Sequence, residues 1–177
     1  AYQVNYTFQQ HSRFCGDAAG LFTSLYSQQP TQYAAFVETA NYAVCSLSPE
    51  LFFKLNNKSI LTSPMKGTAK RGLTYAEDLR QAKILHNSKK DRAENVMIVD
   101  MLRNDLSNIA DTGSIKADQL FDTCAYPSLW QMTSNVSAQT HAGLNDIFRD
   151  LFPCASITDL STFSLSSEFC VLSYSCF

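Results

Sequence analysis

The sequence predicts an α+β fold whose sheets are antiparallel. Strand-like segments outnumber helical ones: four lie within residues 33–62 and three within residues 114–139, and two helical patterns separate these groups. A parallel sheet would need a crossover, usually a helix, between successive strands. The grouping of strands into consecutive runs therefore favours α+β over alternating strand and helix.

The first elements are predicted from their hydrophobic periodicity. Residues 2–8 alternate between apolar or aromatic and polar side chains, which is the pattern of a strand with one buried face. Apolar residues then recur at helical spacing from Ala18 to Tyr26, which predicts a short amphipathic helix. An antiparallel meander and then a Pro-Met-Lys-Gly loop are expected next. The expected strands of the meander are 33–38, 42–47, 51–55 and 59–62.

Two helices are predicted in the middle of the chain. Thr74 opens a T-x-x-E capping box, so the first helix should start there and run to about His86. The second helix should start near Lys90. Because residues 96–102 are apolar on nearly all sides, we expect this helix to be buried between layers.

Three strands and a short helix complete the pattern. The strands are expected near residues 114–119, 121–126 and 131–139, and the helix at residues 143–151. Four apolar side chains at helical spacing should point inward from that helix. They are Leu144, Ile147, Phe148 and Leu151.

The composition sets limits on location and partners. The 177 residues are 45% hydrophobic with a formal net charge of -2, enough for one domain with its own core. Lys and Arg do not gather into one block, so neither nucleic acid nor a membrane is an expected partner. No apolar run reaches the roughly 18 residues of a spanning helix. The six cysteines are scattered and form no CxxC pair, which predicts free thiols. Together with the lack of a leader before Ala1, this predicts a cytoplasmic protein.

Three places in the sequence stand out as candidates for chemistry. Glu50 follows Ser-Pro just before an apolar strand, where a carboxylate is costly to bury without a partner. Lys66 precedes Gly67, and a glycine lets backbone approach a ligand closely. Glu94 and Asp100 lie on a helix that is otherwise too apolar for a surface helix.

Each candidate has an ordinary structural alternative. Glu50 could be a solvated turn residue, and Lys66 could be a surface lysine. Glu94 could form an ion pair with Arg92 or Arg103 on its own helix. Composition and periodicity leave these alternatives open and lead no further than a cytosolic α+β domain.

Six segments carry a resemblance to a known family. In order they are YQVNYTF (2–8), SPELFF (48–53), PMKGT (64–68), KDRAENVMIVDMLRNDL (90–106), YPSLWQMTS (126–134) and LFPCASIT (151–158). Together they resemble the chorismate-utilising enzymes, which include anthranilate, isochorismate and aminodeoxychorismate synthases. The resemblance makes residues 1–158 part of a chorismate-binding catalytic domain. It implies a fold of antiparallel sheets packed face to face with helices outside.

The resemblance also implies a reaction. Lys66 favours the aminodeoxychorismate synthase branch, because anthranilate synthases usually carry Ala at this position. In that branch chorismate is aminated to 4-amino-4-deoxychorismate, a step towards p-aminobenzoate and folate. Lys66 would be the nucleophile at ring carbon 2, and Glu50 the general acid on the departing 4-hydroxyl. Ammonia would come from a glutamine amidotransferase subunit.

The resemblance further implies a metal and a substrate site. Glu94 matches a ligand of Mg²⁺, a hard cation that prefers carboxylate oxygens and would hold the ring carboxylate of the substrate. Other matching positions carry hydroxyl side chains that would line the substrate site. These positions are Thr68, Ser134, Ser156 and Thr158.

The chain departs from the family at two places. Trp130 stands where many relatives have His, a feature that some members of this branch share. After Thr158 the family continues with Gly-Ala-Pro-Lys, whereas residues 159–177 here are Ser-rich and contain neither Lys nor Arg. We therefore expect an aberrant tail from a truncation or frameshift, and a chain that folds poorly and is inactive alone. A non-catalytic remnant and an anthranilate synthase-like chorismate-binding protein are the alternatives.

Overall fold

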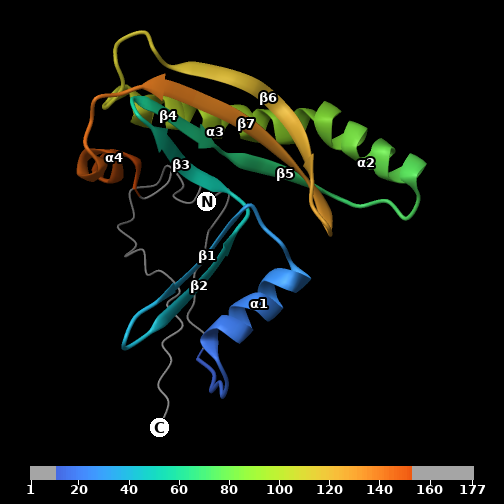
Figure 1. Cartoon of the computed structure of the whole chain (residues 1–177). Coiled ribbons are helices and arrows are strands. Elements are labelled where there is room, and N and C mark those ends of the chain that lie inside the picture. The colour runs from blue at the N-terminus through green and yellow to red at the C-terminus, as the bar shows by residue number, and fades with distance from the viewer. Residues whose placement is uncertain (1–10, 153–177) are drawn as a thin grey trace. The chain divides into compact units, whose positions relative to one another are not determined.

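The computed structural model describes residues 11–152, which are divided between two compact units (Figure 1). Within this range, residues 11–50 belong to the first unit and residues 51–152 to the second. The predicted strand at 2–8 and the predicted tail at 159–177 lie outside the described residues. None of the helices within 11–152 combines the length and the apolar character needed to cross a membrane.

The first unit is a helix followed by a β-hairpin. Its elements are α1 (Ala18–Gln28), β1 (Tyr33–Glu38) and β2 (Ala43–Ser48). Helix α1 begins after Asp17, whose carboxylate accepts a hydrogen bond from the Gly20 N–H at 2.7 Å and so satisfies a free donor of the first turn. The rings of Phe22 on α1 and Phe36 on β1 lie 5.6 Å apart, so the helix packs on the hairpin through aromatic contact.

The second unit contains a five-stranded antiparallel sheet and three helices. Its strands are β3 (Leu51–Asn56), β4 (Ser59–Ser63), β5 (Met65–Lys70), β6 (Lys116–Ala125) and β7 (Leu129–Gln139). Its helices are α2 (Tyr75–Asn87), α3 (Lys89–Ser107) and α4 (Leu144–Leu151). Strand β7 pairs with β4 and β5 along one edge and with β6 along the other. The predicted α+β class with antiparallel sheets is confirmed.

Three of the sequence expectations about strands are wrong in detail. The meander is interrupted, because among the described strands β2 pairs with β1 alone and β3 pairs with β4. The expected loop at 64–67 is largely strand β5: Pro64 has no N–H for a ladder, but its carbonyl accepts from Ser134 N at 3.2 Å and keeps the chain beside β7. The two strands expected at 114–119 and 121–126 are one bulged strand, β6.

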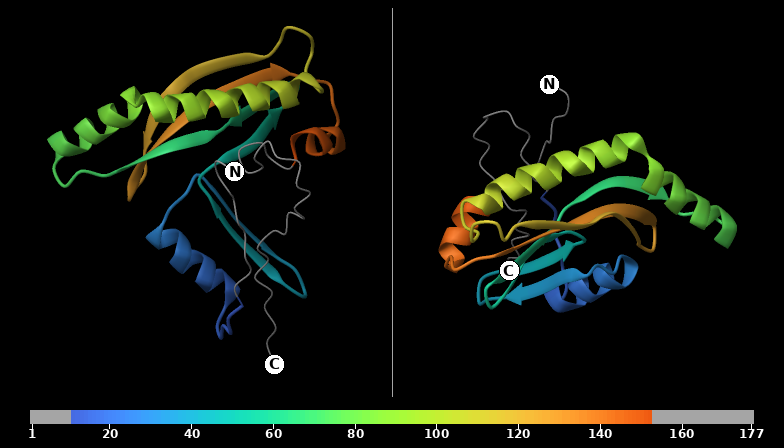
Figure 2. Two further views of the ribbon diagram at one scale, coloured as in Figure 1. Left: turned by 180° about the vertical axis from the view of Figure 1, so that it is seen from behind. Right: turned by 90° about the horizontal axis from the view of Figure 1, so that it is seen from above.

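Helices α2 and α3 run along the same face of this sheet (Figure 2). A buried cluster joins α3 and α4 to the strands; its members are Ile60, Val99, Leu106, Val136, Ala138, Ile147 and Leu151. Contrary to expectation, α3 is not covered on all sides within the described residues, since Val99 is 4% exposed but Met97 is 57% exposed.

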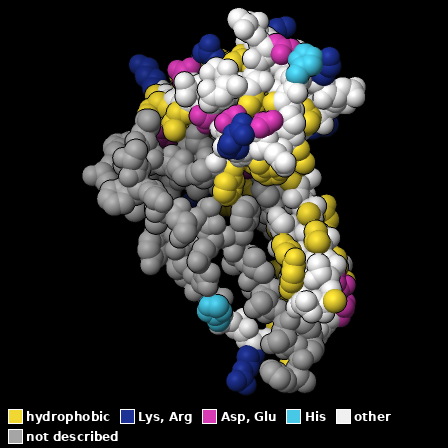
Figure 3. All heavy atoms as spheres, turned by 90° about the vertical axis from the view of Figure 1, so that its left-hand side faces the viewer, with side chains coloured by type: hydrophobic (Ala, Val, Ile, Leu, Met, Phe, Trp, Pro, Cys, Tyr) yellow, Lys and Arg dark blue, Asp and Glu magenta, His cyan; other side chains and the backbone are white. Residues whose placement is uncertain are grey.

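Helix α4 is also more exposed than its apolar pattern predicts. Ile147 and Leu151 are buried as expected, whereas Leu144 and Phe148 reach the surface. Figure 3 looks at the side of the second unit on which α4 lies, and hydrophobic side chains reach the surface there. The turn of the helix places two of the four apolar residues over the core, and the other two at its margin.

Replacing Ile60 by Ala should lower the free energy of unfolding by about 2–5 kcal/mol, because Ile60 of β4 is fully buried in the cluster that joins the sheet to α3 and α4. The matched substitution Ile84→Ala, at a position that is 56% exposed on α2, should cost less than about 1 kcal/mol. Chemical denaturation of both variants measures the difference. Equal losses would contradict this assignment of the core.

Candidate functional site

The face of β7 turned away from the helices is polar from Gln131 to Gln139. Side chains alternate along a strand, and Val136 and Ala138 face the helices in the buried cluster. After Leu129, the opposite face carries only amide and hydroxyl side chains, and this part is called the polar face below. Its residues on β7 are Gln131, Thr133, Asn135, Ser137 and Gln139.

Hydrogen bonds join the polar face to the neighbouring strands. The Thr68 hydroxyl of β5 donates to Gln131 Oε1 at 2.9 Å. The Ser63 hydroxyl donates to Asn135 Oδ1 at 2.8 Å, and Asn135 Nδ2 donates to Gln119 Oε1 at 2.6 Å. Thr68, a predicted substrate residue, therefore lies exposed on a surface of neutral hydrogen-bonding groups.

Lys66 lies in a β-bulge of strand β5. Met65 is paired with Thr133 and Thr68 with Gln131, so three steps along β5 match two along β7, and the extra residue falls within Lys66–Gly67. Lys66 is half-buried. The lysine thus lies two residues before Thr68, at a break in a regular ladder.

Gly67 permits this bulge for two reasons. Its φ of +93° is one that side-chain-bearing residues rarely adopt. An added Cβ would also lie only 2.8 Å from the Cβ of Asp91 on α3. The close approach of α3 therefore explains why position 67 carries a glycine. The sequence alone suggests a different explanation, the close approach of a ligand.

Glu94 lies on α3 with its side chain one third exposed. Its ion-pair partner is Lys90, one helical turn earlier, with 3.8 Å between Nζ and Oε1. The two arginines considered as partners are engaged elsewhere: the Arg92 guanidinium lies 4.2 Å from the Phe121 ring centroid, and Arg103 pairs with Asp100 at 3.1 Å. A long, exposed ion pair of this kind contributes little to stability.

The described residues do not by themselves form a metal site. Within residues 11–152, no three His, Cys, Asp or Glu side chains gather closely enough to hold a metal ion. The carboxylate of Glu94 has the right chemistry for Mg²⁺. One carboxylate does not make a site, so no chemical step is assigned to a metal here.

Ser134 lies on the opposite face of β7 from Thr68. Its buried hydroxyl donates to Asn95 Oδ1 on α3 and accepts from the Phe121 N–H at 3.1 Å. Asn95 is fully buried as well, and its Nδ2 has no hydrogen-bond partner within residues 11–152. Thr68 and Ser134, both predicted to line the substrate site, therefore lie on opposite faces of the sheet. Ser156 and Thr158, predicted for the same site, lie outside the described residues.

Glu50 is the last residue of the first unit, whereas Lys66, Thr68 and Glu94 belong to the second. A tight turn holds it: the Ser48 hydroxyl donates to the Glu50 carbonyl at 3.0 Å and accepts from the Glu50 N–H at 3.3 Å. Ser48 of the Ser-Pro-Glu motif therefore fixes the backbone that carries the carboxylate.

A second bulge, in β6, was not predicted from the sequence. Gln119 and Phe121 both have positive φ values, of 49° and 66°, which is unfavourable for residues other than glycine. Side chains bind the backbone of Phe121: Ser134 accepts from its N–H, and His86 Nδ1 lies 2.9 Å from its carbonyl oxygen. Because a carbonyl only accepts, Nδ1 of His86 is the donor in this contact.

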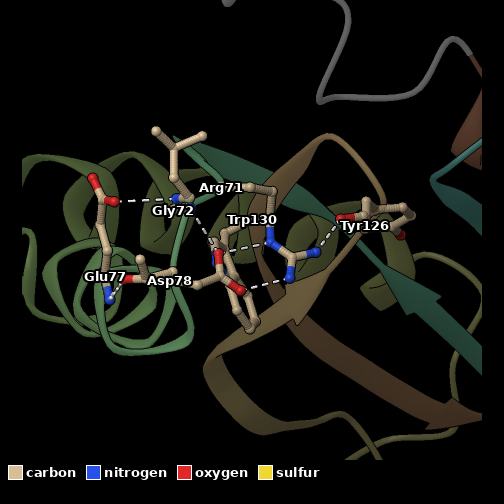
Figure 4. Close-up of polar contacts among 8 residues, drawn as sticks. Arg71, Gly72, Glu77, Asp78, Tyr126 and Trp130 are labelled. Atoms are coloured by element: carbon tan, nitrogen blue, oxygen red, sulfur yellow. Dashed lines mark hydrogen bonds and ion pairs between the residues drawn. The ribbon is translucent and has the colours of Figure 1, made fainter.

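A compact polar cluster joins the end of β5 to α2 and β7 (Figure 4). The Asp78 carboxylate accepts from both Arg71 Nε and Arg71 Nη2, at 2.8 and 2.5 Å. It also accepts from Gly72 N at 2.9 Å and from the Trp130 indole N–H at 2.8 Å. The hydrogen bond from Arg71 is the main cause that holds the pKa of Asp78 far below its usual range.

Sequence reasoning missed several of these residues. The alternation of polar and apolar residues across 131–139 could have revealed the polar face. Nothing local marks Asp78 as a partner of Trp130, because the two residues are 52 positions apart. Asp105 on α3 is another partly buried carboxylate, and burial raises its pKa.

Comparison with known proteins identifies relatives over most of the chain. Residues 1–160 match the family described as chorismate binding enzymes. Aminodeoxychorismate synthase component 1 of Escherichia coli (strain K12) is 40% identical over 159 residues, which are 89% of this chain and 35% of that protein. The chloroplastic aminodeoxychorismate synthase of Arabidopsis thaliana is 38% identical over 147 residues, 80% of this chain and 16% of that protein. The chain therefore spans about a third or less of these relatives.

Solved structures show the same fold. Anthranilate synthase component I from Streptococcus pneumoniae TIGR4 matches with a TM-score of 0.73 over 84% of this chain and 33% of that one, at 22% identity. A putative 2,3-dihydroxybenzoate-specific isochorismate synthase from Bacillus anthracis matches with a TM-score of 0.65 at 17% identity, over 80% of this chain and 39% of that one.

Gly67→Ala should destabilise the protein more than Gly113→Ala does. Both glycines have positive φ values, so each substitution should cost about 1 kcal/mol or more in backbone strain. Only at Gly67 would the new methyl group also collide with Asp91, since nothing lies within 4 Å of a Cβ at Gly113. Urea denaturation of both variants gives the difference. A Gly113 variant that is equally destabilised would show that the contact with α3 does not matter.

Proposed function

Since this chain belongs to the family of chorismate binding enzymes, we propose that it forms part of a catalytic domain that aminates chorismate to 4-amino-4-deoxychorismate. The observation that carries the proposal is Lys66, within a Pro-Met-Lys-Gly-Thr segment that runs as a bulged strand beside the polar face. The aminodeoxychorismate synthases among its relatives support it. The product would serve p-aminobenzoate and folate synthesis in the cytoplasm.

In the proposed reaction Lys66 is a nucleophile. Its amine forms a bond to ring carbon 2, the ring double bonds shift, and the 4-hydroxyl leaves with the displaced electron pair. Glu50 donates a proton to the departing hydroxyl, so that it leaves as water. Ammonia then adds at ring carbon 4, and the reverse shift of the double bonds releases the amine of Lys66 from carbon 2.

The surroundings of Thr68 suit a role in binding this substrate. Its hydroxyl donates its only proton to Gln131, so the lone pairs of Thr68 Oγ1 remain to accept a hydrogen bond from a ligand. Chorismate carries a hydroxyl that could donate such a bond. Thr68 would then orient the ring next to Lys66, two residues earlier on the same strand. Ser134 would support the site from the helix side of β7.

We also propose Glu94 as one oxygen ligand of Mg²⁺, with further ligands from outside residues 11–152. The support is that neither nearby arginine neutralises its carboxylate and that the contact with Lys90 is long. Bound Mg²⁺ would neutralise the ring carboxylate of the substrate. The designation "component 1" of the bacterial relatives agrees with a second subunit, which we propose is a glutamine amidotransferase that supplies ammonia.

A competing proposal is an anthranilate synthase-like activity on the same substrate. Anthranilate synthase component 1 of Aquifex aeolicus (strain VF5) is 30% identical over 158 residues, 88% of this chain and 32% of that protein. The two proposals differ at Lys66, because the covalent step needs an amine there. Analysis of the product distinguishes them directly.

Lys66→Ala should abolish amination. The test uses a chimera in which residues 1–158 replace the matching segment of the E. coli relative, supplied with chorismate, Mg²⁺ and ammonia. Loss of the nucleophile should lower the rate of aminodeoxychorismate formation by about 100-fold or more while chorismate still binds. Lys70→Ala, which removes an exposed lysine from the same strand, should leave the rate near that of the parent. Near-normal turnover by the Lys66 variant, or anthranilate as the product, would refute the assignment.

Glu94→Gln should raise the Mg²⁺ concentration needed for half-maximal activity of the chimera by about tenfold or more, since a neutral amide is a poorer ligand of a hard cation. Asp100→Asn removes a carboxylate of the same helix that pairs with Arg103, and should leave the Mg²⁺ requirement unchanged. A magnesium titration and a thermal melt of each variant separate binding from folding. If the Glu94 variant loses stability but keeps its Mg²⁺ requirement, the ion pair with Lys90 is the role of Glu94.

A further inference from the structure

We propose that Asp78 is a positioning residue that clamps strand β5 to strand β7 beside the bulge at Lys66. It would act through Arg71, Gly72 and Trp130, and would hold Lys66 and Thr68 in register with the polar face. The importance of that register for catalysis rests on the proposed function. The clamp itself rests only on the contacts around Asp78.

Strand β5 needs such a clamp because few paired positions specify its register after the bulge. Among the described strands it pairs with β7 alone. After the bulge three paired positions remain: Thr68 with Gln131, Ala69 with Trp130, and Lys70 with Leu129. A slip by one residue would turn Thr68 away from the polar face, since neighbouring residues of a strand point to opposite faces.

Asp78 binds both strands of this short ladder. Its Oδ1 accepts from the backbone of Gly72 and the side chain of Arg71, the two residues that follow β5. The same oxygen accepts from the indole of Trp130, which on β7 is the partner of Ala69. One carboxylate oxygen therefore links the end of β5 to the adjacent position of β7 (Figure 4).

Arg71 extends the clamp to the turn between β6 and β7. Its Nη1 donates to the carbonyl of Tyr126 at 2.6 Å, and its guanidinium carbon lies 5.0 Å from the Trp130 ring centroid. The paired nitrogens on Asp78 make a bidentate, charge-assisted contact, the strongest common type of side-chain pair. Because the Asp78 side chain is only 13% exposed, water competes with this contact far less than at a surface ion pair.

The start of α2 is built around the same carboxylate. A Cβ on Gly72 would lie 2.3 Å from the backbone nitrogen of Asp78, so only glycine allows the end of the strand to come this close to the helix. Asp78 lies in the first turn of α2, where the helix dipole favours a negative charge. Thr74 caps the helix separately, so a carboxylate at position 78 is not needed as the cap.

Hydrogen exchange distinguishes a local clamp from general stabilisation. In the 177-residue chain, Asp78→Ala should raise the exchange rates of the amides at 68–70 by about tenfold or more, while β4 changes by less than about twofold. Strand β4 is a suitable internal reference, because it pairs with the other half of β7 along the same edge. Asp78→Asn keeps the shape of the side chain but removes its charge. It should raise the exchange rates of the same amides by a smaller factor.

Two outcomes of the exchange experiment would overturn the proposal. Equal increases in β4 and β5 would mean that Asp78 stabilises the whole unit, and unchanged exchange at 68–70 would mean that β5 needs no clamp. Asp146→Ala is the matched control, since it removes an acidic residue that pairs with Arg149 at 2.8 Å on α4. It should leave β5 unchanged.

The single tryptophan of the chain provides a second measurement. The indole N–H of Trp130 gives one resonance, shifted by its hydrogen bond to the carboxylate, and Asp78→Ala should move it towards the value of a solvated indole. Because Arg71 holds the pKa of Asp78 far below normal, the contact should persist as pH falls through 4 and be lost only at lower pH. The stability that Asp78 adds is thus complete at neutral pH and is lost on acidification. An indole resonance unchanged by Asp78→Ala would refute the contact.

Neither measurement uses chorismate, so the two proposals can fail separately. An inactive parent chimera, together with faster β5 exchange in the Asp78→Ala variant of the 177-residue chain, would refute the proposed function and leave the clamp. An active chimera that Asp78→Ala leaves active, together with unchanged β5 exchange in the 177-residue variant, would refute the clamp and leave the function.

Discussion

The organisation of the larger unit depends on the pairing of β7 with its neighbours. This strand carries β4 and β5 on one edge and β6 on the other, and it separates an apolar face from a polar one. A strand with both edges paired and one face buried has a single permitted register. The positions of Lys66, Thr68 and Ser134 follow from that register, and the cluster of Ile60, Val136 and α3 fixes it through burial.

The candidate functional residues are distributed around this strand. Thr68 of β5 binds Gln131 on the polar face, and Ser134 and Asn95 lie on the opposite side. Lys66 lies at the bulge of β5, two residues before Thr68. Such an arrangement needs glycine at two close approaches, where Gly67 meets α3 and where Gly72 meets the start of α2. Gly67 lies within β5 and Gly72 two residues after it, so helices constrain this strand at two places.

Much of this could be predicted from the sequence, because the signals are local. The capping threonine at 74, the helix that follows it and the strand at 33–38 lie where their patterns place them. The sequence predicts a loop where β5 lies, because Pro64 and Gly67 are typical of turns. The residues of β7 that pair with β5 are about sixty or more positions away along the chain. The contact of Asp78 with Trp130 likewise has no local signal. The residue pattern marks Lys66 and Glu94 as candidates but leaves ordinary structural alternatives open, and only the resemblance to a family assigns them proposed roles.

The bulge in β6 has a consequence for how this protein meets other chains. An edge strand offers a regular row of free N–H and C=O groups, to which a strand of another molecule can add. Among the described strands β6 pairs with β7 alone, and its left-handed residues Gln119 and Phe121 interrupt that row. Ser134 and His86 bind the backbone groups of Phe121. The bulge beside Asn95 therefore makes this edge of the described sheet a poor template for a further strand.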